Sequence, residues 1–161
     1  MKENDIQALL IEDERNREYL TYADIWEGSL LVTCEKAYLC VHFRYYEMAR
    51  EYCRDCEIIL CRDIDEMLEK MFRTEKIRSL AVERSRMATA RFLKMESLLK
   101  GGKILPGLCA DAIVKEFRKI KDSYEADCIR RAQKITDDAY EYILQTACAG
   151  MKESDIRIAL G

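Results

Sequence analysis

The stretch from Arg17 to Ala49 constrains the fold of this chain most, because it predicts two adjacent strands and a helix without a gap. Gly28 ends a polar turn, and a short apolar run from Ser29 to Thr33 follows it. The tight turn Cys34-Glu35-Lys36 then leads into a second β-rich run, Ala37 to Val41. Two such runs joined by so short a turn predict an antiparallel hairpin.

A helix is expected directly after this hairpin. Between Phe43 and Tyr52, the side chains of Tyr45, Met48 and Ala49 recur at helical spacing and share one face with Tyr52. The hairpin is therefore connected to this helix with almost no loop.

Strands and helices alternate along the following part of the chain. Further strands are expected at residues 6–11, 56–61, 78–83 and 103–105. Asp63 is a predicted helix N-cap because Glu66 follows three residues later, and Ser85 is a second predicted N-cap. Helices between consecutive strands favour parallel neighbours, whereas the hairpin makes the sheet mixed. The pattern predicts an α/β fold, with a mixed β-sheet of about five or six strands flanked by helices.

Composition agrees with a chain that buries a core, because 49% of its 161 residues are hydrophobic. No apolar run approaches the roughly 18 residues of a spanning helix, and the first residues lack a signal-peptide core. We therefore expect a cytoplasmic protein with no membrane partner. A net charge of -3 and a pI near 5.4 argue against a nucleic-acid partner.

The chain has eight cysteines, which we expect to remain thiols because no secretion signal precedes them. Cys53-Arg54-Asp55-Cys56 is the exception, since a two-residue spacer is compatible with zinc or redox chemistry. A zinc site would need further ligands, for which only Cys40, Cys61 and His42 are at hand. A thioredoxin-like motif opens a helix, whereas this one closes a helix. Incidental cysteines are the favoured interpretation.

The residue inventory offers no catalytic residue and no metal site. A two-metal hydrolytic site needs several carboxylates, usually with an imidazole, and His42 is the single histidine of the chain. The acidic runs Glu12-Asp13-Glu14, Asp63/Asp65 and Asp137-Asp138 are interpreted as helix caps or solvated surfaces.

Three short segments together resemble a known family. They are the turn Tyr19-Leu20-Thr21, the strand Leu30-Leu31-Val32-Thr33 and the segment His42-Phe43-Arg44-Tyr45. Their order is similar to that in the N-terminal domain of the Xaa-Pro aminopeptidase, prolidase and creatinase family, although His42 stands where the family has aspartate. Arg118 to Asp122 resembles the segment that opens the catalytic domain of that family, and Gly150-Met151 resembles a turn a little later in it.

The resemblance implies two parts. Residues 1–119 correspond to the N-terminal domain, with its first helix missing, and residues 120–161 to the initial helices of a truncated pita-bread metallopeptidase domain. Without the first helix, the sheet near Leu9 and Ile11 is expected to lose cover. The two divalent metal ions of the full-length parent would be held by residues beyond Gly161, so this chain is expected to hold no cofactor and to be inactive.

The family fold also bears on the helical end of the chain. One apolar stripe there comprises Cys128, Ala132, Ile135, Ala139 and Ile143. In a complete relative this stripe would pack on the catalytic sheet, so here it is expected to lack part of its cover, which favours self-association or fraying. The alternative is a helix that completes a three-layer core.

The resemblance further implies a homodimer in which this domain restricts the partner's substrate channel, with Xaa-Pro peptides as substrates of the full-length parent only. The channel candidates are Trp26, His42, Arg44 and Tyr45. The alternatives are a core anchor for Trp26 and an ion pair with Glu47 for Arg44. Tyr45 and its neighbour at 46 are expected to divide between core and surface. The alternative functions are a stand-alone interaction or dimerisation module and, from the cysteines, a zinc or redox protein.

Overall fold

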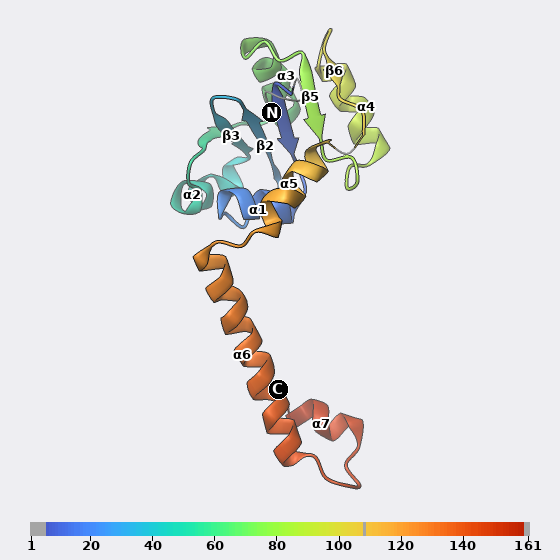
Figure 1. Cartoon of the computed structure of the whole chain (residues 1–161). Helices are drawn as coiled ribbons and strands as arrows, with labels where there is room; N and C mark the ends of the chain where they lie inside the picture. The colour runs from blue at the N-terminus through green and yellow to red at the C-terminus, as the bar shows by residue number, and fades with distance from the viewer. Residues whose placement is uncertain (1–5, 108, 160–161) are drawn as a thin grey trace. The chain divides into compact units, whose positions relative to one another are not determined.

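The computed structural model describes residues 6–107 and 109–159, which form two compact units divided between Phe117 and Arg118. The first unit contains the sheet and the helices that cover it, and the second contains helices only (Figure 1).

The first unit is built on a mixed sheet of six strands within the described residues, which confirms the predicted α/β fold. The strands are β1 (Ala8–Ile11), β2 (Gly28–Thr33), β3 (Ala37–Val41), β4 (Glu57–Leu60), β5 (Ser79–Val82) and β6 (Lys103–Ile104). Their spatial order is β4-β3-β2-β1-β5-β6. The predicted hairpin is β2–β3, with Leu30 opposite Leu39, and β2 also runs antiparallel to β1. The other three pairs are parallel, as expected for strands separated by helices.

Helices cover both faces of the sheet. The helices of this unit are α1 (Glu14–Thr21), α2 (Phe43–Tyr52), α3 (Ile64–Thr74), α4 (Thr89–Leu98) and α5 (Cys109–Lys119). One core cluster joins a sheet face to α3 and α4, and a second cluster joins the opposite face to α1, α2 and α5. All four residues of β1 and of β5 are buried because both of their faces are covered.

Helix α1 was not expected, since Tyr19-Leu20-Thr21 was interpreted as part of a turn. Asp13 caps the helix by accepting a hydrogen bond from the Asn16 N–H at 3.1 Å, and Tyr22 ends it in a left-handed conformation. The buried residues of α1 are Arg17 and Thr21. Because both are polar, no apolar stripe marks this helix in the sequence.

The two predicted N-caps have different outcomes. The Asp63 carboxylate accepts hydrogen bonds from the N–H groups of Asp65 at 2.8 Å and Glu66 at 3.1 Å, which confirms it as the cap of α3. The prediction for Ser85 is wrong, because α4 has Ala88 at its N-cap position. The Ser85 hydroxyl instead donates to the Asp111 carboxylate, and this contact links the β5–α4 connection to α5.

Cover on the sheet near Leu9 and Ile11 is better than expected. Their exposed fractions are 7% and 0%, and both belong to the cluster that contains Ala110 and Val114 of α5. The expectation of lost cover is therefore wrong for these two side chains. The prediction that the first helix of the family is missing concerns residues before Ile6, which lie outside the described ones.

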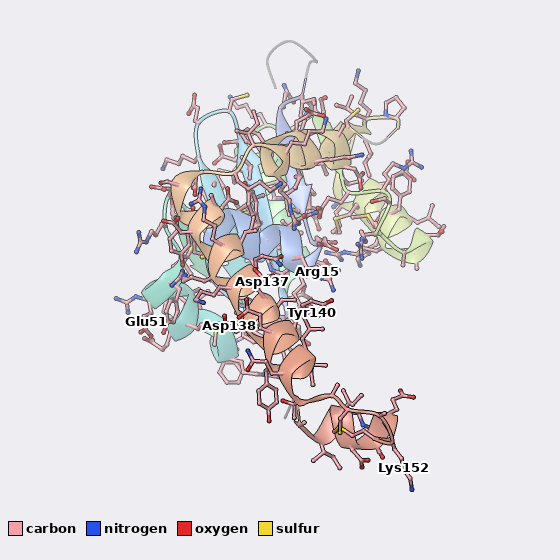
Figure 2. The ribbon with its side chains drawn as sticks, turned by 60° about the horizontal axis from the view of Figure 1, so that its bottom comes forward. Arg15, Glu51, Asp137, Asp138, Tyr140 and Lys152 are labelled. Carbon is pink, nitrogen blue, oxygen red and sulfur yellow. A yellow bond between two sulfur atoms is a disulfide. The ribbon has the colours of Figure 1, made fainter. Side chains whose placement is uncertain are left out.

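The second unit consists of α6 (Ser123–Thr146) and α7 (Glu153–Ala159). A capping box starts α6, in which Asp122 accepts from the Glu125 N–H at 2.8 Å and Glu125 accepts from the Asp122 N–H at 2.8 Å. Helix α6 buries none of its residues, so its stripe completes no core within this unit. Figure 2 shows Asp137, Asp138 and Tyr140 projecting from α6. No helix among the described residues is long and apolar enough to cross a membrane.

Candidate functional site

An open hollow of about 580 Å³ lies where β1, β3 and β4 end and β2 begins. We name it the Trp26 pocket. Its lining residues are Glu12, Arg17, Trp26, Glu27, Gly28, Ser29, His42, Arg62, Asp63, Ile64, Asp65 and Arg91. Carboxyl ends of neighbouring parallel strands meet at one edge of a sheet, so the loops that follow them converge here.

Arg17 holds the loop that carries Trp26. Its side chain is 1% exposed, and one terminal nitrogen donates to the carbonyl oxygens of Glu12 and Gly28, each at 2.9 Å. The other terminal nitrogen donates to the carbonyl oxygen of Ile25. These bonds fix the backbone on both sides of Trp26, so a buried cation sets the position of the loop.

A buried carboxylate organises the chain beside this cation. Glu83 is 2% exposed and accepts from the N–H groups of Glu12 at 2.8 Å and Asp13 at 2.9 Å, and from Asn16 Nδ2 at 2.6 Å. Burial lowers the pKa of the Arg17 guanidinium, while nearby carboxylates including Glu12 and Asp13 favour its charged form. The segment between β1 and α1 is thus tied to the end of β5.

Arg91 forms one wall of the pocket, and its guanidinium group already has hydrogen-bond partners within the protein. It donates to the Glu12 carboxylate at 2.9 and 2.5 Å and to Asp65 at 2.5 Å, and the hydrogen bond to Glu12 is the largest cause of a raised Arg91 pKa. The Ser29 hydroxyl also donates to Glu12, at 2.7 Å. The charges of Arg91, Glu12 and Asp65 are already paired with one another. This bidentate network therefore has a structural role.

Four lining side chains have no such partner. The side chains of Trp26, Glu27, His42 and Arg62 form no hydrogen bond or ion pair with other residues of the described chain. Trp26 is 70% exposed, although a core position was the alternative for it. The pocket therefore presents an indole ring, an imidazole, a cation and a carboxylate to solvent. Such a set can bind a small molecule that carries both charges and an apolar part.

Two of the four predicted channel residues, Trp26 and His42, line this pocket. Sequence reasoning missed Arg17, Arg62 and Arg91. The position of Arg62 directly before a predicted N-cap was the only signal for it in the sequence. Periodicity does not distinguish an arginine that forms hydrogen bonds within the protein from one that is solvated.

Arg44 and Tyr45, the other two candidates, lie outside the lining of the pocket. Arg44 is exposed and forms no ion pair with Glu47 or with any other residue that the structure describes. Tyr45 is half-buried against the second core cluster, and Tyr46 is too. The expected division of the two tyrosines between core and surface is therefore wrong.

Within residues 6–107 and 109–159, no group of three or more histidine, cysteine, aspartate or glutamate side chains is placed to hold a metal ion. The acidic runs have ordinary structural roles. Asp13 and Asp63 cap helices, and Asp138 pairs with Lys134 at 2.9 Å. The expectation of caps and surface carboxylates is confirmed for these residues.

One expectation about the cysteines is wrong. Cys53 and Cys56 form a disulfide, with their Cα atoms 6.8 Å apart, although all eight cysteines were expected to be thiols. The remaining six are free, and Cys40 and Cys61 among them are buried.

Comparison with known proteins agrees with the resemblance seen in the sequence. Residues 1–120 match the family model described as Creatinase/Prolidase N-terminal domain. The chain is 29% identical over 157 residues to the Xaa-Pro dipeptidase of Pyrococcus horikoshii, which covers 97% of this chain and 42% of that protein.

Solved structures of similar proteins extend over almost the whole chain. The Xaa-Pro dipeptidase from Bacillus anthracis has a TM-score of 0.88 at 23% identity and covers 99% of this chain and 44% of its own. The X-Pro aminopeptidase from Thermotoga maritima has a TM-score of 0.84 at 25% identity. This match covers 96% of this chain and 45% of the aminopeptidase chain. The chain spans less than half the length of these relatives. From the family match, which covers most of its residues, this chain belongs to the creatinase/prolidase N-terminal domain family.

Proposed function

We propose that this chain is the N-terminal, non-catalytic part of a proline-specific metallopeptidase that acts as a dimer. The observation that carries the proposal is the alignment of 157 residues with an Xaa-Pro dipeptidase more than twice as long. In this proposal residues 120–161 are the first helices of the catalytic domain. The two divalent metal ions and their ligands belong to the part that lies beyond the aligned region.

The Trp26 pocket is the part of this chain that would face substrate. Its indole ring is exposed on a loop whose backbone is held on both sides by Arg17. A rigid aromatic ring can pack on the apolar ring of a proline, while Arg62 and Glu27 offer charges for the two ends of a short peptide. Set over the partner's active site, such a surface would narrow the channel and exclude long peptides.

A direct assay tests the non-catalytic part of the proposal. The purified chain is incubated with an Xaa-Pro dipeptide and Mn²⁺ or Co²⁺, with and without a chelator. We expect no metal-dependent release of proline. Robust turnover that the chelator abolishes would overturn the proposal.

The channel role is tested in a protein that has the catalytic half, made by fusing this chain to the remaining part of the Pyrococcus horikoshii dipeptidase. Trp26→Ala should raise kcat/KM for a pentapeptide relative to a dipeptide by about tenfold, which corresponds to roughly 1.4 kcal/mol. Phe43→Ala is the matched control, because Phe43 is 79% exposed and lies outside the pocket lining. An unchanged ratio in Trp26→Ala, or an equal change in both variants, would contradict the channel role.

The dimer is tested by sedimentation of the chain alone and of the fusion protein. We expect the fusion to be a dimer, and a monomeric fusion would contradict this part of the proposal. If the chain alone forms a stable dimer and Trp26→Ala leaves the fusion unchanged, a stand-alone dimerisation module is the better description.

A further inference from the structure

The turn between α2 and β4 contains a bonded cysteine pair that the proposed function does not use. Two residues separate Cys53 from Cys56, and their Cα atoms are 6.8 Å apart, within the range that a disulfide spans. Both side chains are half-buried against the core cluster that contains α2. The other six cysteines of the chain are free.

The local backbone brings the two sulfur atoms together. Cys53 is the C-cap of α2, where its N–H donates to the Ala49 carbonyl oxygen at 2.9 Å. Asp55 has a φ of 59°, a left-handed conformation that turns the chain sharply, and Cys56 lies directly before β4. The disulfide therefore joins the end of α2 to the start of β4.

The position of the pair at a helix end indicates what it can do. Catalytic pairs place the attacking thiol at a helix N-terminus, where the helix dipole stabilises the thiolate. Cys53 lies at the C-terminal end of α2, where the dipole has the opposite sign and disfavours a thiolate. This pair is thus suited to holding two elements together, and unsuited to rapid exchange with other proteins.

Strand β4 is the element that the disulfide holds. It is a four-residue strand at one edge of the sheet, and among the described strands it pairs with β3 alone. Ile58 and Ile59 are half-buried, and Leu60 is 50% exposed. Because so little burial secures β4, this strand is expected to open more readily than the buried central strands. The same strand leads into Arg62 of the Trp26 pocket.

We propose that Cys53 and Cys56 are a reversible redox-modification site that locks β4 to α2 when oxidised and releases it when reduced. In the closing reaction one cysteine thiolate attacks glutathione disulfide, which forms a mixed disulfide and releases one glutathione. The second cysteine then attacks the protein sulfur of the mixed disulfide and releases the other glutathione. Two electrons and two protons pass from the cysteine pair to glutathione disulfide.

The test begins by counting thiols in the full chain. Samples equilibrated at several ratios of reduced to oxidised glutathione are quenched with acid, unfolded and alkylated, and the modified sites are located by mass spectrometry. We expect six alkylated cysteines at oxidising ratios and eight at reducing ratios, with Cys53 and Cys56 as the two that change. Eight alkylated cysteines at every ratio, or pairing of either residue with another cysteine, would overturn the proposal.

Amide hydrogen exchange then measures whether the disulfide stabilises β4. The amides of residues 53–61 should exchange at least tenfold faster in the reduced chain, whereas those of β1 and β5 should not change. The double variant Cys53→Ser/Cys56→Ser should exchange at the reduced rate under both conditions, and Cys34→Ser, which changes an exposed free cysteine, should keep the response. Equal exchange in both redox states of the wild-type chain would overturn the locking role, even if the double variant did not fold.

Discussion

Replacing Arg17 with methionine should destabilise the first unit and loosen the loop that carries Trp26. The substitution keeps a long unbranched side chain but removes donors to the carbonyl oxygens of Glu12, Ile25 and Gly28. A hydrogen bond from a charged group is worth about 1.5–3 kcal/mol. The desolvation that lowers the pKa of Arg17 offsets part of their sum, so we expect a net loss of about 3 kcal/mol.

The assay is thermal unfolding of the full chain, followed by circular dichroism. With an unfolding entropy of about 2.1 cal/mol/K per residue, a loss of about 3 kcal/mol in a unit that ends at Phe117 lowers Tm by about 12 °C. Arg15→Met is the matched control, because Arg15 is exposed on the same helix (Figure 2). The control should change stability by less than about 0.5 kcal/mol.

Tryptophan fluorescence distinguishes a change in the loop from a change in the rest of the unit. Trp26 is the single tryptophan of the chain, so its emission reports on this loop alone. Acrylamide should quench Trp26 more efficiently in Arg17→Met than in the wild-type chain below the unfolding transition. If Arg17→Met lowered the free energy of unfolding by less than about 1 kcal/mol and left the quenching unchanged, the role of Arg17 in holding the loop would be refuted.

Two further predictions concern buried groups. Burial raises the pKa of the Cys40 thiol from 9.0 to about 12, so the unfolded chain releases this proton first as the pH rises. Stability should therefore fall between pH 9 and 12, by about 1 kcal/mol per pH unit, and urea unfolding of Cys40→Val should lack this contribution. Glu83→Gln keeps only one acceptor oxygen for the three donors that now bind Glu83, and should lower the free energy of unfolding by about 2 kcal/mol. The exposed Glu51→Gln should have no measurable effect in the same urea titration, and equal effects of the two glutamine variants would refute the role of Glu83.

Local patterns were sufficient for most of the elements. The hairpin of β2 and β3 was predictable because its two apolar runs are joined by three residues, so pairing costs little chain entropy. The N-cap at Asp63 was predictable because its partners are two and three residues away. Helix α1 could not be predicted in this way. Its buried residues are Arg17 and Thr21, and the groups that satisfy Arg17 include carbonyls outside the helix.

The candidate site depended on contacts that the sequence does not display. Trp26 and His42 were selected from a resemblance, but their proximity to Arg62 follows from the order of strands that brings three loops to one edge. The disulfide between Cys53 and Cys56 likewise depends on the left-handed backbone at Asp55.

The amino-acid sequence by itself determined the α/β class, the hairpin and the similarity to a peptidase family, because each of these is encoded in short-range periodicity or in contiguous motifs. Tertiary structure decided the strand order, helix α1, the exposure of Trp26 and which arginines are engaged. These properties depend on hydrogen bonds between residues that are far apart in the chain, such as Glu12 and Arg91, which are 79 positions apart. Such bonds form only when packing of the two apolar cores brings distant segments together.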